Sequence, residues 1–474
     1  MKIKLAGIKK KKRVLIVGAG TAGRLTADEM LRHGELNYSP IGFIDDSPAK
    51  RGTSYRKLKV LGAAADLAKV AGRARADLIL ISIPSATGAQ VKTILAACRK
   101  TDLPVRIVPG YFEVLDSRAR IEPTRRLRIE DILRRKPVKI RFAEIRKNLR
   151  NKRVLVTGAG GSIGSMLSEQ LALLKPGKLV LLDNSENSLH WLKFRIKDRR
   201  NVVFSLSDIR DKAKVSHIFK KYRPDIVFHA AAYKHVPILE RNVSEAVLNN
   251  VESTVNLIDC AGRHGAKELI FISTDKAVKP TSVLGKTKKA GEMYISAAQR
   301  RSPVKLLSVR FGNVVRSSGS VVEVFERQLE AGGPLTLTHP DVTRYFMSID
   351  EACLLILNTV AISRGGEIFV LDMGEPVKVL DLARDLIRLR GLVPGADVRI
   401  KYTGLRPGEK LHEELYDARR EELRASPHPF MMIIDQSRTP VRPEFKKALA
   451  GLIACARNYD DAKTRALLDK LVRL

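Results

Sequence analysis

The sequence predicts an α/β protein with two doubly wound parallel sheets, the second carrying a smaller C-terminal substrate-binding lobe. An apolar stretch runs into a glycine-rich turn twice, in RVLIVGAGTAGRL (13–25) and in RVLVTGAGGSIGSML (153–167). After each turn, short apolar stretches alternate with helical patterns, which is typical of parallel strands covered by helices on both faces. Both domains are therefore predicted to be Rossmann-like.

Length and composition agree with two globular domains. The chain has 474 residues, 44% hydrophobic residues and no low-complexity tract. Its four cysteines lack paired metal-ligand spacing, so we expect a reducing cytosol and no metal site. The net charge of +35 favours anionic partners. Because no zinc-finger or RNA-binding signature accompanies that charge, specific nucleic-acid binding is not expected.

The first domain is predicted over residues 1–116. Its glycine turn follows a basic stretch that imitates a signal peptide, but the glycines and the amphipathic segment after them favour a phosphate-binding turn and a helix. Later strands are expected at 41–45, 78–84 and 105–109. The template for a dinucleotide is met by Gly18, Gly20, Gly23 and Asp45. No proton-transfer cluster follows, so this domain either binds a ligand or only organises the assembly.

A basic connector is predicted over residues 117–152. It holds fourteen Lys and Arg against four Asp and Glu. Two short helices are expected in it, at LRIEDILRRK and FAEIRKNLR. A solvated linker is one interpretation, and a face that contacts anionic lipid or a neighbouring subunit is the other.

The second domain is predicted over residues 153–474. Strands are expected at 178–183, 201–208, 225–232, 268–274 and 305–313, each alternating with a helix. After about residue 315 the rhythm breaks into Gly- and Pro-punctuated pieces, as expected of a lobe that closes over a substrate, and the last fifty residues look mostly helical. No apolar run approaches the roughly 20 residues that span a bilayer.

The second glycine turn predicts the cofactor. Gly158, Gly161 and Gly164 let a pyrophosphate approach the backbone at a helix N-terminus. Asp183 follows about 20 residues later, where a carboxylate accepts hydrogen bonds from a ribose 2′-hydroxyl and repels a 2′-phosphate, so NAD is favoured over NADP. Further cofactor contacts are predicted at Ser162, Ile163, Asp208, Ile209, Ala230, Ala231 and Ala232.

The stretch STDKAVKPTSVLGKTK (273–288) predicts the proton chemistry. In short-chain dehydrogenases/reductases a tyrosine precedes a lysine by four residues, so that both lie on one helical face. Here Lys288 is present, but position 284 is Leu. Thr274, Asp275 and Lys276 follow a strand end, where ligands bind in open α/β sheets, and offer an acid beside an amine. The alternative is a surface ion pair. Lys288 is expected to orient the nicotinamide ribose and to lower nearby pKa values.

A second polar group follows the strand at 225–232. In HAAAYKHVPILE (229–240), Tyr233, Lys234 and His235 are predicted at the same rim. A lone His235 is more often structural than catalytic, so no base role is assigned to it.

At these residues the sequence closely resembles the CapD-like polysaccharide-biosynthesis family, which are UDP-N-acetylglucosamine 4,6-dehydratases of the extended short-chain dehydrogenase/reductase group. The resemblance covers most of residues 150–435. The stretches that carry it are VLVTGAGGSIGS, LLDNSEN, HAAAYKHVP, STDKAVKP, RFGNVV, SSGSV, THPDVTRYFM, GEIFVLDMGEPVKV and GLRPGEKLHEE. GFIDDSPAKRG (42–52) resembles the preceding domain of the longer members.

The resemblance implies a redox-neutral elimination of water from UDP-N-acetylglucosamine, giving a UDP-2-acetamido-2,6-dideoxy-4-hexulose for surface polysaccharide. Asp275 would be the acid at C6, Lys276 the base at C5, and Thr274 the hydrogen-bonding partner of the O4 proton. The expected UDP-sugar contacts are Lys234, His235, Asn313, Arg344, Arg406 and Glu409, arginine because its fork matches phosphate oxygens.

Several expectations stay open at this point. Long family members carry transmembrane helices before the first domain, whereas this chain begins directly at it, so we expect a soluble, cytoplasmic form. Peripheral contact with anionic membrane and a homo-oligomer are further expectations. Leu284 and Arg316, where a glycine would be expected, depart from the family pattern. The alternatives to a dehydratase are a UDP-sugar epimerase of the same fold and a non-catalytic protein that binds nucleotides or anionic surfaces.

Overall fold

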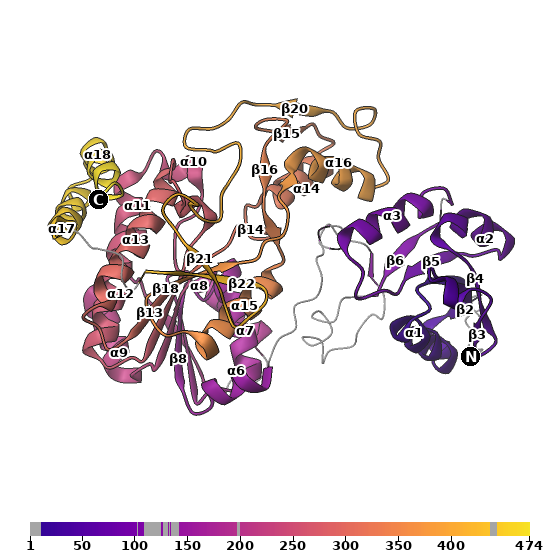
Figure 1. The fold of residues 1–474 in the computed structure, drawn as a ribbon, viewed down its shortest axis with the longest axis horizontal. Coiled ribbons are helices and arrows are strands. Elements are labelled where there is room, and N and C mark those ends of the chain that lie inside the picture. Colours follow the sequence, from indigo (N-terminus) through magenta and orange to yellow (C-terminus); the bar gives the residue numbers. More distant parts are fainter. Residues whose placement is uncertain are drawn as a thin grey trace, which may run out of the picture. The chain divides into compact units, whose positions relative to one another are not determined.

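A computed structural model describes residues 11–101, 103–108, 125–126, 131, 133, 142–196, 200–436 and 443–474. The chain divides into two compact units, Met1–Pro137 and Val138–Leu474, and each is considered by itself (Figure 1). Most of the predicted connector lies outside the described residues. Its described part includes α6 (Phe142–Leu149), which belongs to the second unit.

The first unit is a sheet in the order β3-β4-β2-β1-β5-β6-β7, parallel except for β3 and β7. Helices alternate with its main strands, because each apolar strand is followed by a turn and an amphipathic segment. The elements are β1 (Lys12–Val17), α1 (Thr21–Arg32), β2 (Tyr38–Ile44), β3 (Ser54–Tyr55), β4 (Leu58–Gly62), α2 (Leu67–Arg73), β5 (Leu78–Ile81), α3 (Gly88–Cys98), β6 (Val105–Ile107) and β7 (Arg125–Arg126).

The first glycine turn has the tight geometry that its spacing predicts. Gly18 has φ +106°, and a Cβ on Gly23 would lie 1.9 Å from the carbonyl oxygen of Gly18. Asp45 closes the turn from β2, since its carboxylate accepts a hydrogen bond from the Ala19 N–H at 2.8 Å. The same carboxylate pairs with Lys50 at 3.0 Å. In this unit the acidic residue of the template is thus engaged by a lysine of its own chain.

The second unit is built on a larger sheet in the order β10-β9-β8-β11-β12-β13-β18-β22-β21. It is parallel from β10 to β18, and β22 and β21 add antiparallel strands at one edge. The strands are β8 (Arg153–Thr157), β9 (Lys178–Asp183), β10 (Val202–Leu206), β11 (Ile226–His229), β12 (Glu268–Ile272), β13 (Lys305–Arg310), β18 (Glu367–Leu371), β21 (Leu423–Ala425) and β22 (Met431–Asp435).

The strand order reverses between β8 and β11, which pair in register with Thr157 opposite His229. The chain runs from β8 outward to β10 and then returns to β11 to build the other half. Ligands of open α/β sheets bind at the carboxyl ends of the strands beside such a reversal. This topology places the predicted cofactor turn after β8 beside the predicted catalytic turn after β12.

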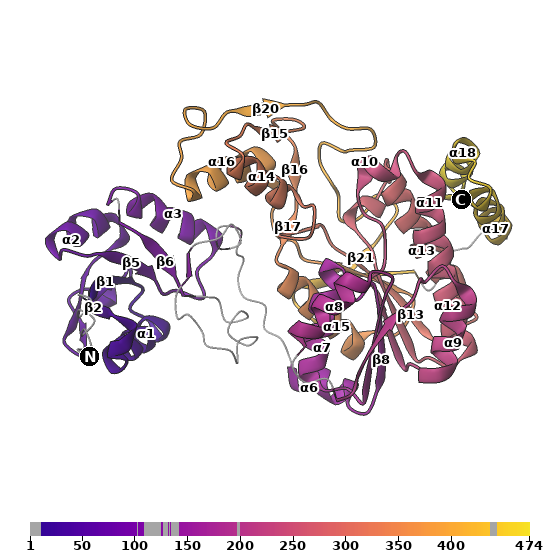
Figure 2. The ribbon, with the colours of Figure 1, turned by 180° about the vertical axis from the view of Figure 1, so that it is seen from behind.

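Helices cover both faces of this sheet (Figure 2). In both views α6, α7 and α15 lie on one side, and α9, α12 and α13 lie on the other. The strands between them are continuous apolar stretches, because both of their faces are buried. The helices are α7 (Ser162–Leu174), α8 (Glu186–Arg195), α9 (Lys212–Tyr222), α10 (Val236–Leu239), α11 (Val243–Val247), the π-helical turn η4 (Leu248–Glu252), α12 (Ser253–Arg263), α13 (Val283–Gln299) and α15 (Ile349–Ile362).

A smaller lobe is built from the segments after β13. Its short strand pairs are β14 with β17, β15 with β20 and β16 with β19, and α14 and α16 pack with them. The elements are β14 (Asn313–Val314), α14 (Val321–Glu330), β15 (Leu335–Leu337), β16 (Thr343–Arg344), β17 (Phe346–Met347), β19 (Val377–Lys378), α16 (Val379–Leu389) and β20 (Ile400–Tyr402).

The chain ends in a helical hairpin, α17 (Glu444–Arg457) and α18 (Asp461–Leu471). Its apolar face packs on α11 and α13 in one buried cluster with Phe445, Leu452 and Leu468. The predicted fold class is confirmed, and the predicted strands agree with the observed ones to within a few residues.

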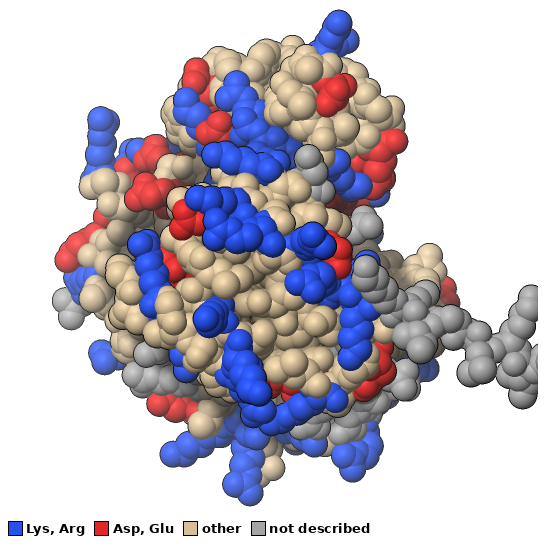
Figure 3. Space-filling view, turned by 90° about the vertical axis from the view of Figure 1, so that its right-hand side faces the viewer, with Lys and Arg blue, Asp and Glu red and all other residues tan. Residues whose placement is uncertain are grey.

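Positive charge is distributed over the face that Figure 3 draws. Lys and Arg side chains are scattered across it among other residues, with several groups of Asp and Glu between them. Among the helices in the described part of the chain, none is both long and apolar enough to cross a membrane.

Candidate active site

A cavity of about 910 Å³ lies at the carboxyl ends of the strands in the second unit. Its walls come from the turns after β8, β11, β12 and β13, from α13 and from the lobe. The predicted site residues that line it are Gly161, Ser162, Ile163, Gly164, Ala230, Ala232, Lys234, His235, Thr274, Lys276, Lys288, Asn313, Arg344, Arg406 and Glu409. Residues as far apart in the chain as Gly161 and Glu409 therefore meet in one cavity, and their roles remain predictions.

The glycine turn after β8 has no side chains that would keep a ligand away from the backbone. Gly158 has φ +67°, and a Cβ there would lie 2.6 Å from the backbone of Ala231. A Cβ on Gly164 would lie 1.9 Å from the carbonyl oxygen of Gly158. Glycine is required at both positions, and the N-terminus of α7 consequently faces the cavity. These features fit the pyrophosphate of a dinucleotide.

Asp183 ends β9 beside a smaller cavity of about 210 Å³ that Gly158, Ile209 and Ala231 also line. Its carboxylate accepts hydrogen bonds from the N–H groups of Gly160 and Ser185, each at 2.8 Å. An oxygen of a carboxylate keeps further acceptor capacity, so Asp183 fits a ribose diol and disfavours a 2′-phosphate.

Asp208 lies differently from the prediction. It is not among the residues that line either cavity, and its carboxylate binds the guanidinium of Arg210 at 2.9 and 2.7 Å. Arg210 also pairs with Glu245 at 3.1 Å. The neighbouring Ile209 does line the smaller cavity, so the turn after β10 contributes an apolar wall there.

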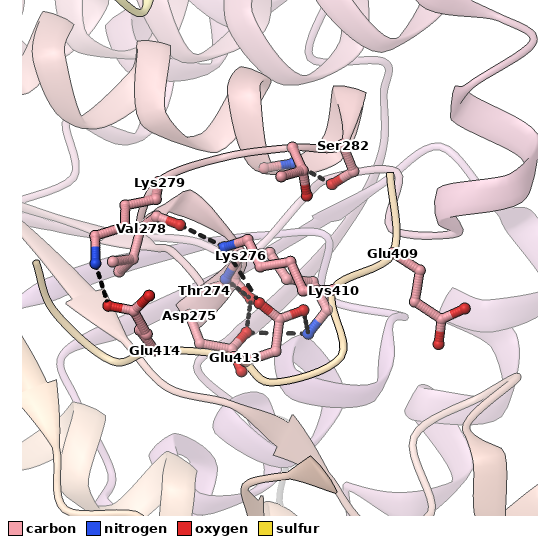
Figure 4. A network of polar contacts seen from close by, with 12 residues as sticks. Thr274, Asp275, Lys276, Val278, Lys279, Ser282, Glu409, Lys410, Glu413 and Glu414 are labelled. Atoms are coloured by element: carbon pink, nitrogen blue, oxygen red, sulfur yellow. Dashed lines mark hydrogen bonds and ion pairs between the residues drawn. The ribbon is translucent and has the colours of Figure 1, made fainter. Parts of the chain in front are cut away.

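The predicted catalytic turn, residues 274–277, follows β12. Thr274 caps the short helix η5 (Asp275–Ala277), and its hydroxyl donates to Asp275 Oδ1 at 2.8 Å. The ammonium of Lys276 donates to Asp275 Oδ1 and to Asn313 Oδ1, both at 3.0 Å. A predicted acid and a predicted base are thus in direct contact (Figure 4), and Lys276 lines the cavity.

The carboxyl of Asp275 is fully buried. Its Oδ2 accepts no hydrogen bond from any residue that the structure describes, and a Cβ on Gly312 would lie 3.1 Å from it. A buried carboxylate oxygen without a donor is costly, so this oxygen depends on the nearby Lys276 charge for its stabilisation.

The helix α13 begins directly after this turn and carries Leu284 and Lys288 on one face. Ser282 caps it by accepting a hydrogen bond from the Gly285 N–H at 3.1 Å. Leu284 is buried and lines the cavity as an apolar wall. Lys288 donates to the carbonyl oxygen of Ile272 at 2.8 Å. Burial lowers the pKa of Lys288 from 10.5 to about 7, against the opposing charge of Glu292.

A cluster of buried ion pairs holds α13 against β13. Arg310, which ends β13 and is fully buried, donates to Glu292 at 2.7 Å and to Glu421 at 2.8 Å. Glu292 also accepts a hydrogen bond from the Ser273 hydroxyl at 2.7 Å. This cluster therefore joins Ser273 at the end of β12, the helix of Lys288 and the segment that precedes β21.

The turn after β11 forms another wall. Asn250, on η4, accepts from the Tyr233 N–H at 2.8 Å and donates to its carbonyl oxygen at 3.0 Å. Burial lowers the pKa of Lys234, and burial together with the Lys234 charge lowers the pKa of His235. Both side chains line the cavity, whereas Asn250, which positions them, carried no motif in the sequence.

The two predicted phosphate-binding arginines differ. Arg344 is buried, and its guanidinium donates to Glu409 at 3.0 Å and to two backbone carbonyl oxygens. Arg406 lines the cavity with an exposed side chain. Arg406 is thus the better candidate for phosphate oxygens, while Arg344 and Glu409 hold the loop in place.

The segment 405–414, which we call the strap, crosses the catalytic turn. The hydroxyl of Thr281 donates to Gly408 O at 2.8 Å, and Lys410 donates to Val278 O at 2.6 Å. Farther along, Glu413 comes within 3.9 Å of the Lys276 ammonium (Figure 4). Sequence reasoning missed Glu413, although it stands in the stretch GLRPGEKLHEE, because no local pattern links it to Lys276.

The arrangement combines a dinucleotide turn, an amine and an apolar wall in one cavity, and a buried carboxyl lies behind the amine in contact with it. A carboxyl and an amine in contact can exchange a proton, after which the pair offers a neutral acid and a neutral base together. Such a pair can remove a proton from one carbon and protonate a hydroxyl that leaves from the adjacent carbon.

Comparisons with known proteins show which sequences and structures the chain is similar to. The family model described as "Polysaccharide biosynthesis protein" matches residues 154–436, and a model described as "CoA-binding domain" matches residues 4–109. The probable polysaccharide biosynthesis protein EpsC of Bacillus subtilis is 41% identical over 407 residues, which cover 85% of this chain and 68% of that protein.

Two further similarities cover somewhat more than half of the chain. The UDP-N-acetylglucosamine 4,6-dehydratase (inverting) of Campylobacter jejuni is 33% identical over 270 residues, 55% of this chain and 76% of that protein. Among solved structures, Pen from Bacillus thuringiensis is 33% identical with a TM-score of 0.57, covering 60% of this chain and 88% of that one.

Proposed function

We propose that this chain, which belongs to the polysaccharide biosynthesis protein family, is an NAD-dependent UDP-N-acetylglucosamine 4,6-dehydratase. By family and fold the chain belongs to a wider group, the nucleotide-sugar dehydratases and epimerases of the short-chain dehydrogenase/reductase fold. The product would be a UDP-2-acetamido-2,6-dideoxy-4-hexulose, a precursor for surface polysaccharide.

The contact between Asp275 and Lys276 carries the proposal. A dehydratase needs an acid for the leaving hydroxyl and a base for the adjacent carbon, and this pair, 3.0 Å apart, supplies both. Leu284 lines the cavity on the helical face where the related reductases carry their tyrosine. The proton chemistry is accordingly assigned to the turn before α13.

Three groups of the chain handle protons in this proposal. NAD bound at the glycine turn would accept hydride from C4 of the sugar and return it to C6. Lys276 removes the C5 proton, which the 4-keto group has acidified, and gives a proton back to C5 when hydride is delivered to C6. Asp275 gives its proton to the C6 oxygen as the C6–O bond breaks, so that one water leaves. Thr274 hydrogen-bonds the O4 hydroxyl, whose proton is released on oxidation.

The lobe would hold the UDP moiety. Arg406 contributes an exposed guanidinium for the diphosphate, and Lys234, His235 and Asn313 line the side of the cavity nearer the sheet. Arg344 acts through Glu409, which it holds at 3.0 Å. A 2′-hydroxyl of the cofactor ribose would bind Asp183, which supports NAD over NADP.

Mass spectrometry of the sugar nucleotide tests the proposal. Purified protein is incubated with UDP-N-acetylglucosamine and NAD, and we expect the substrate to lose one water. An epimerase of the same fold also oxidises C4 but returns hydride there, so its product keeps the substrate mass. An unchanged mass with NAD bound to the protein would contradict the dehydratase proposal.

Variants of the turn test the assignment of roles. We expect Asp275→Asn and Lys276→Ala to lower kcat by about 10²-fold or more, because each removes a proton-transfer group. Leu284→Ala is expected to keep most of the activity, since it only trims an apolar wall. Greater loss with Leu284→Ala than with Asp275→Asn would overturn the assignment.

A further inference from the structure

Lys276 has a second carboxylate neighbour in addition to Asp275. Glu413 reaches it from the strap, with Oε1 3.9 Å from the Lys276 ammonium. Glu413 lines the cavity, and its side chain is only 4% exposed. Its Oε2 accepts no hydrogen bond from any described residue. A buried carboxylate with so few donors must interact mainly through its charge.

Lys410 balances this charge. Its ammonium lies 3.4 Å from Glu413 Oε2 and is held in place by donating to the Val278 carbonyl oxygen at 2.6 Å. The four side chains therefore alternate in sign, in the order Asp275, Lys276, Glu413, Lys410, with two charges from the catalytic turn and two from the strap (Figure 4).

We propose that Glu413 and Lys410 are positioning residues that set the protonation of Lys276, so that the strap tunes the base of the catalytic turn. The inference rests on the proposed function, because it concerns the base of that reaction. The Glu413 carboxylate stabilises the Lys276 ammonium, which holds the side chain in the cavity. Lys410 offsets this charge, so that the ammonium can still give its proton to Asp275.

Two substitutions that each remove one charge are therefore expected to have opposite effects on the protonation of Lys276. Glu413→Gln removes a negative charge, which makes the neutral amine of Lys276 easier to form. Lys410→Gln removes the positive charge but keeps an N–H donor, which leaves Glu413 uncompensated and favours the ammonium. A role in packing alone would not produce shifts of opposite sign.

Other charged or titratable groups also lie near Lys276, and they are unchanged in these variants. Besides Asp275, Glu413 and Lys410, they are Lys288 on α13, Tyr345 beside Asp275, and Arg344, Arg406 and Glu409, which line the cavity. Glu414 provides the matched control. It stands next to Glu413 but is exposed and pairs with Lys279 at 2.5 Å.

The pH dependence of water loss is the first measurement. The rate is expected to fall at low pH, where Asp275 and Lys276 both hold a proton and the pair has no base left. We expect the midpoint of that fall to move down by about one pH unit in Glu413→Gln and up by about half a unit in Lys410→Gln. Glu414→Gln is expected to leave it in place. Equal midpoints in an active wild type and all variants would overturn the inference and leave the proposed function intact.

Chemical labelling is the second measurement and does not need turnover. Acetic anhydride modifies only neutral amines, and peptide mass spectrometry reports the extent at Lys276 as a function of pH. The same opposite shifts are expected. If the wild type loses no water from the sugar but these shifts occur, the proposed function fails while the charge effect stands. If Lys410→Gln does not fold, an unmoved labelling midpoint in Glu413→Gln overturns the inference by itself.

Discussion

Lys288 is a site residue whose burial lowers the stability of the folded chain. Its amine is buried beneath the cavity, 4.4 Å from the centre of the Phe271 ring, and its pKa is lowered to about 7. Below pH 7 the folded chain must hold this amine charged, and that cost is fully present. Between pH 7 and 10.5 only the unfolded chain binds the proton, so the cost diminishes as pH rises.

We therefore predict that Lys288→Met raises the melting temperature of the protein without added nucleotide. The gain in the free energy of unfolding is expected to be a few kcal/mol at pH 6 to 7 and to shrink toward pH 10. Thermal melts at several pH values measure it. Lys446→Met, at an exposed position of α17, is the control and should give no such trend. A gain that is constant with pH would contradict the prediction.

Residues 274–288 illustrate what could be predicted at the residue scale. Thr274, Asp275, Lys276 and Lys288 follow from their place after a strand, because strand ends of a parallel sheet share one edge. Glu413 and Asn250 could not be found this way. Their partners lie 137 and 17 positions away in the chain, and only folding brings them into contact.

At the scale of elements, the C-terminal hairpin supports the helix that carries Lys288. Arg465, on α18, donates to the Glu240 carboxylate at 2.8 Å and to its carbonyl oxygen at 2.6 Å. The other oxygen of Glu240 accepts from the Val283 N–H, at the start of α13, at 2.6 Å. A carboxylate there also interacts favourably with the helix dipole. The hairpin thus reaches the first turn of α13 through the Glu240 side chain, and Asp469 of α18 also pairs with Lys286 of α13 at 2.6 Å.

Accordingly, Arg465→Ala is predicted to destabilise the protein by about 1 to 3 kcal/mol, because Glu240 loses the partner of a part-buried charge. Denaturant unfolding gives the change. Lys470→Ala, an exposed lysine on the same helix, is the matched control and is expected to change the free energy of unfolding by less than about 0.5 kcal/mol. Equal effects of both substitutions would count against this coupling.

At the scale of the whole molecule, the cavity and its walls belong to the second unit. Its lining residues fall between Gly161 and Glu413, and the unit has its own sheet and buried core. The first unit repeats the glycine turn, but Lys50 engages the acidic residue that would face a ribose. The proposed chemistry therefore needs only residues after Pro137.

We predict that residues 138–474 fold by themselves and bind NAD as tightly as the full chain does, within about threefold. Calorimetric titration with NAD on both proteins measures this. Gly164→Ala in the same fragment is the negative control, because its Cβ would lie 1.9 Å from the Gly158 carbonyl oxygen. A fragment that folds but does not bind NAD would show that the first unit contributes to the cofactor site.

The sequence by itself determined the two α/β domains, the glycine turns and the catalytic turn. These depend on local signals: apolar stretches, glycine spacing and residues that directly follow a strand. Only the tertiary structure decided how the strap meets that turn, which arginine stays exposed and which is engaged by Glu409, and that Asp208 turns to Arg210. Such contacts join residues far apart in the chain, and their geometry depends on how the lobe packs against the sheet.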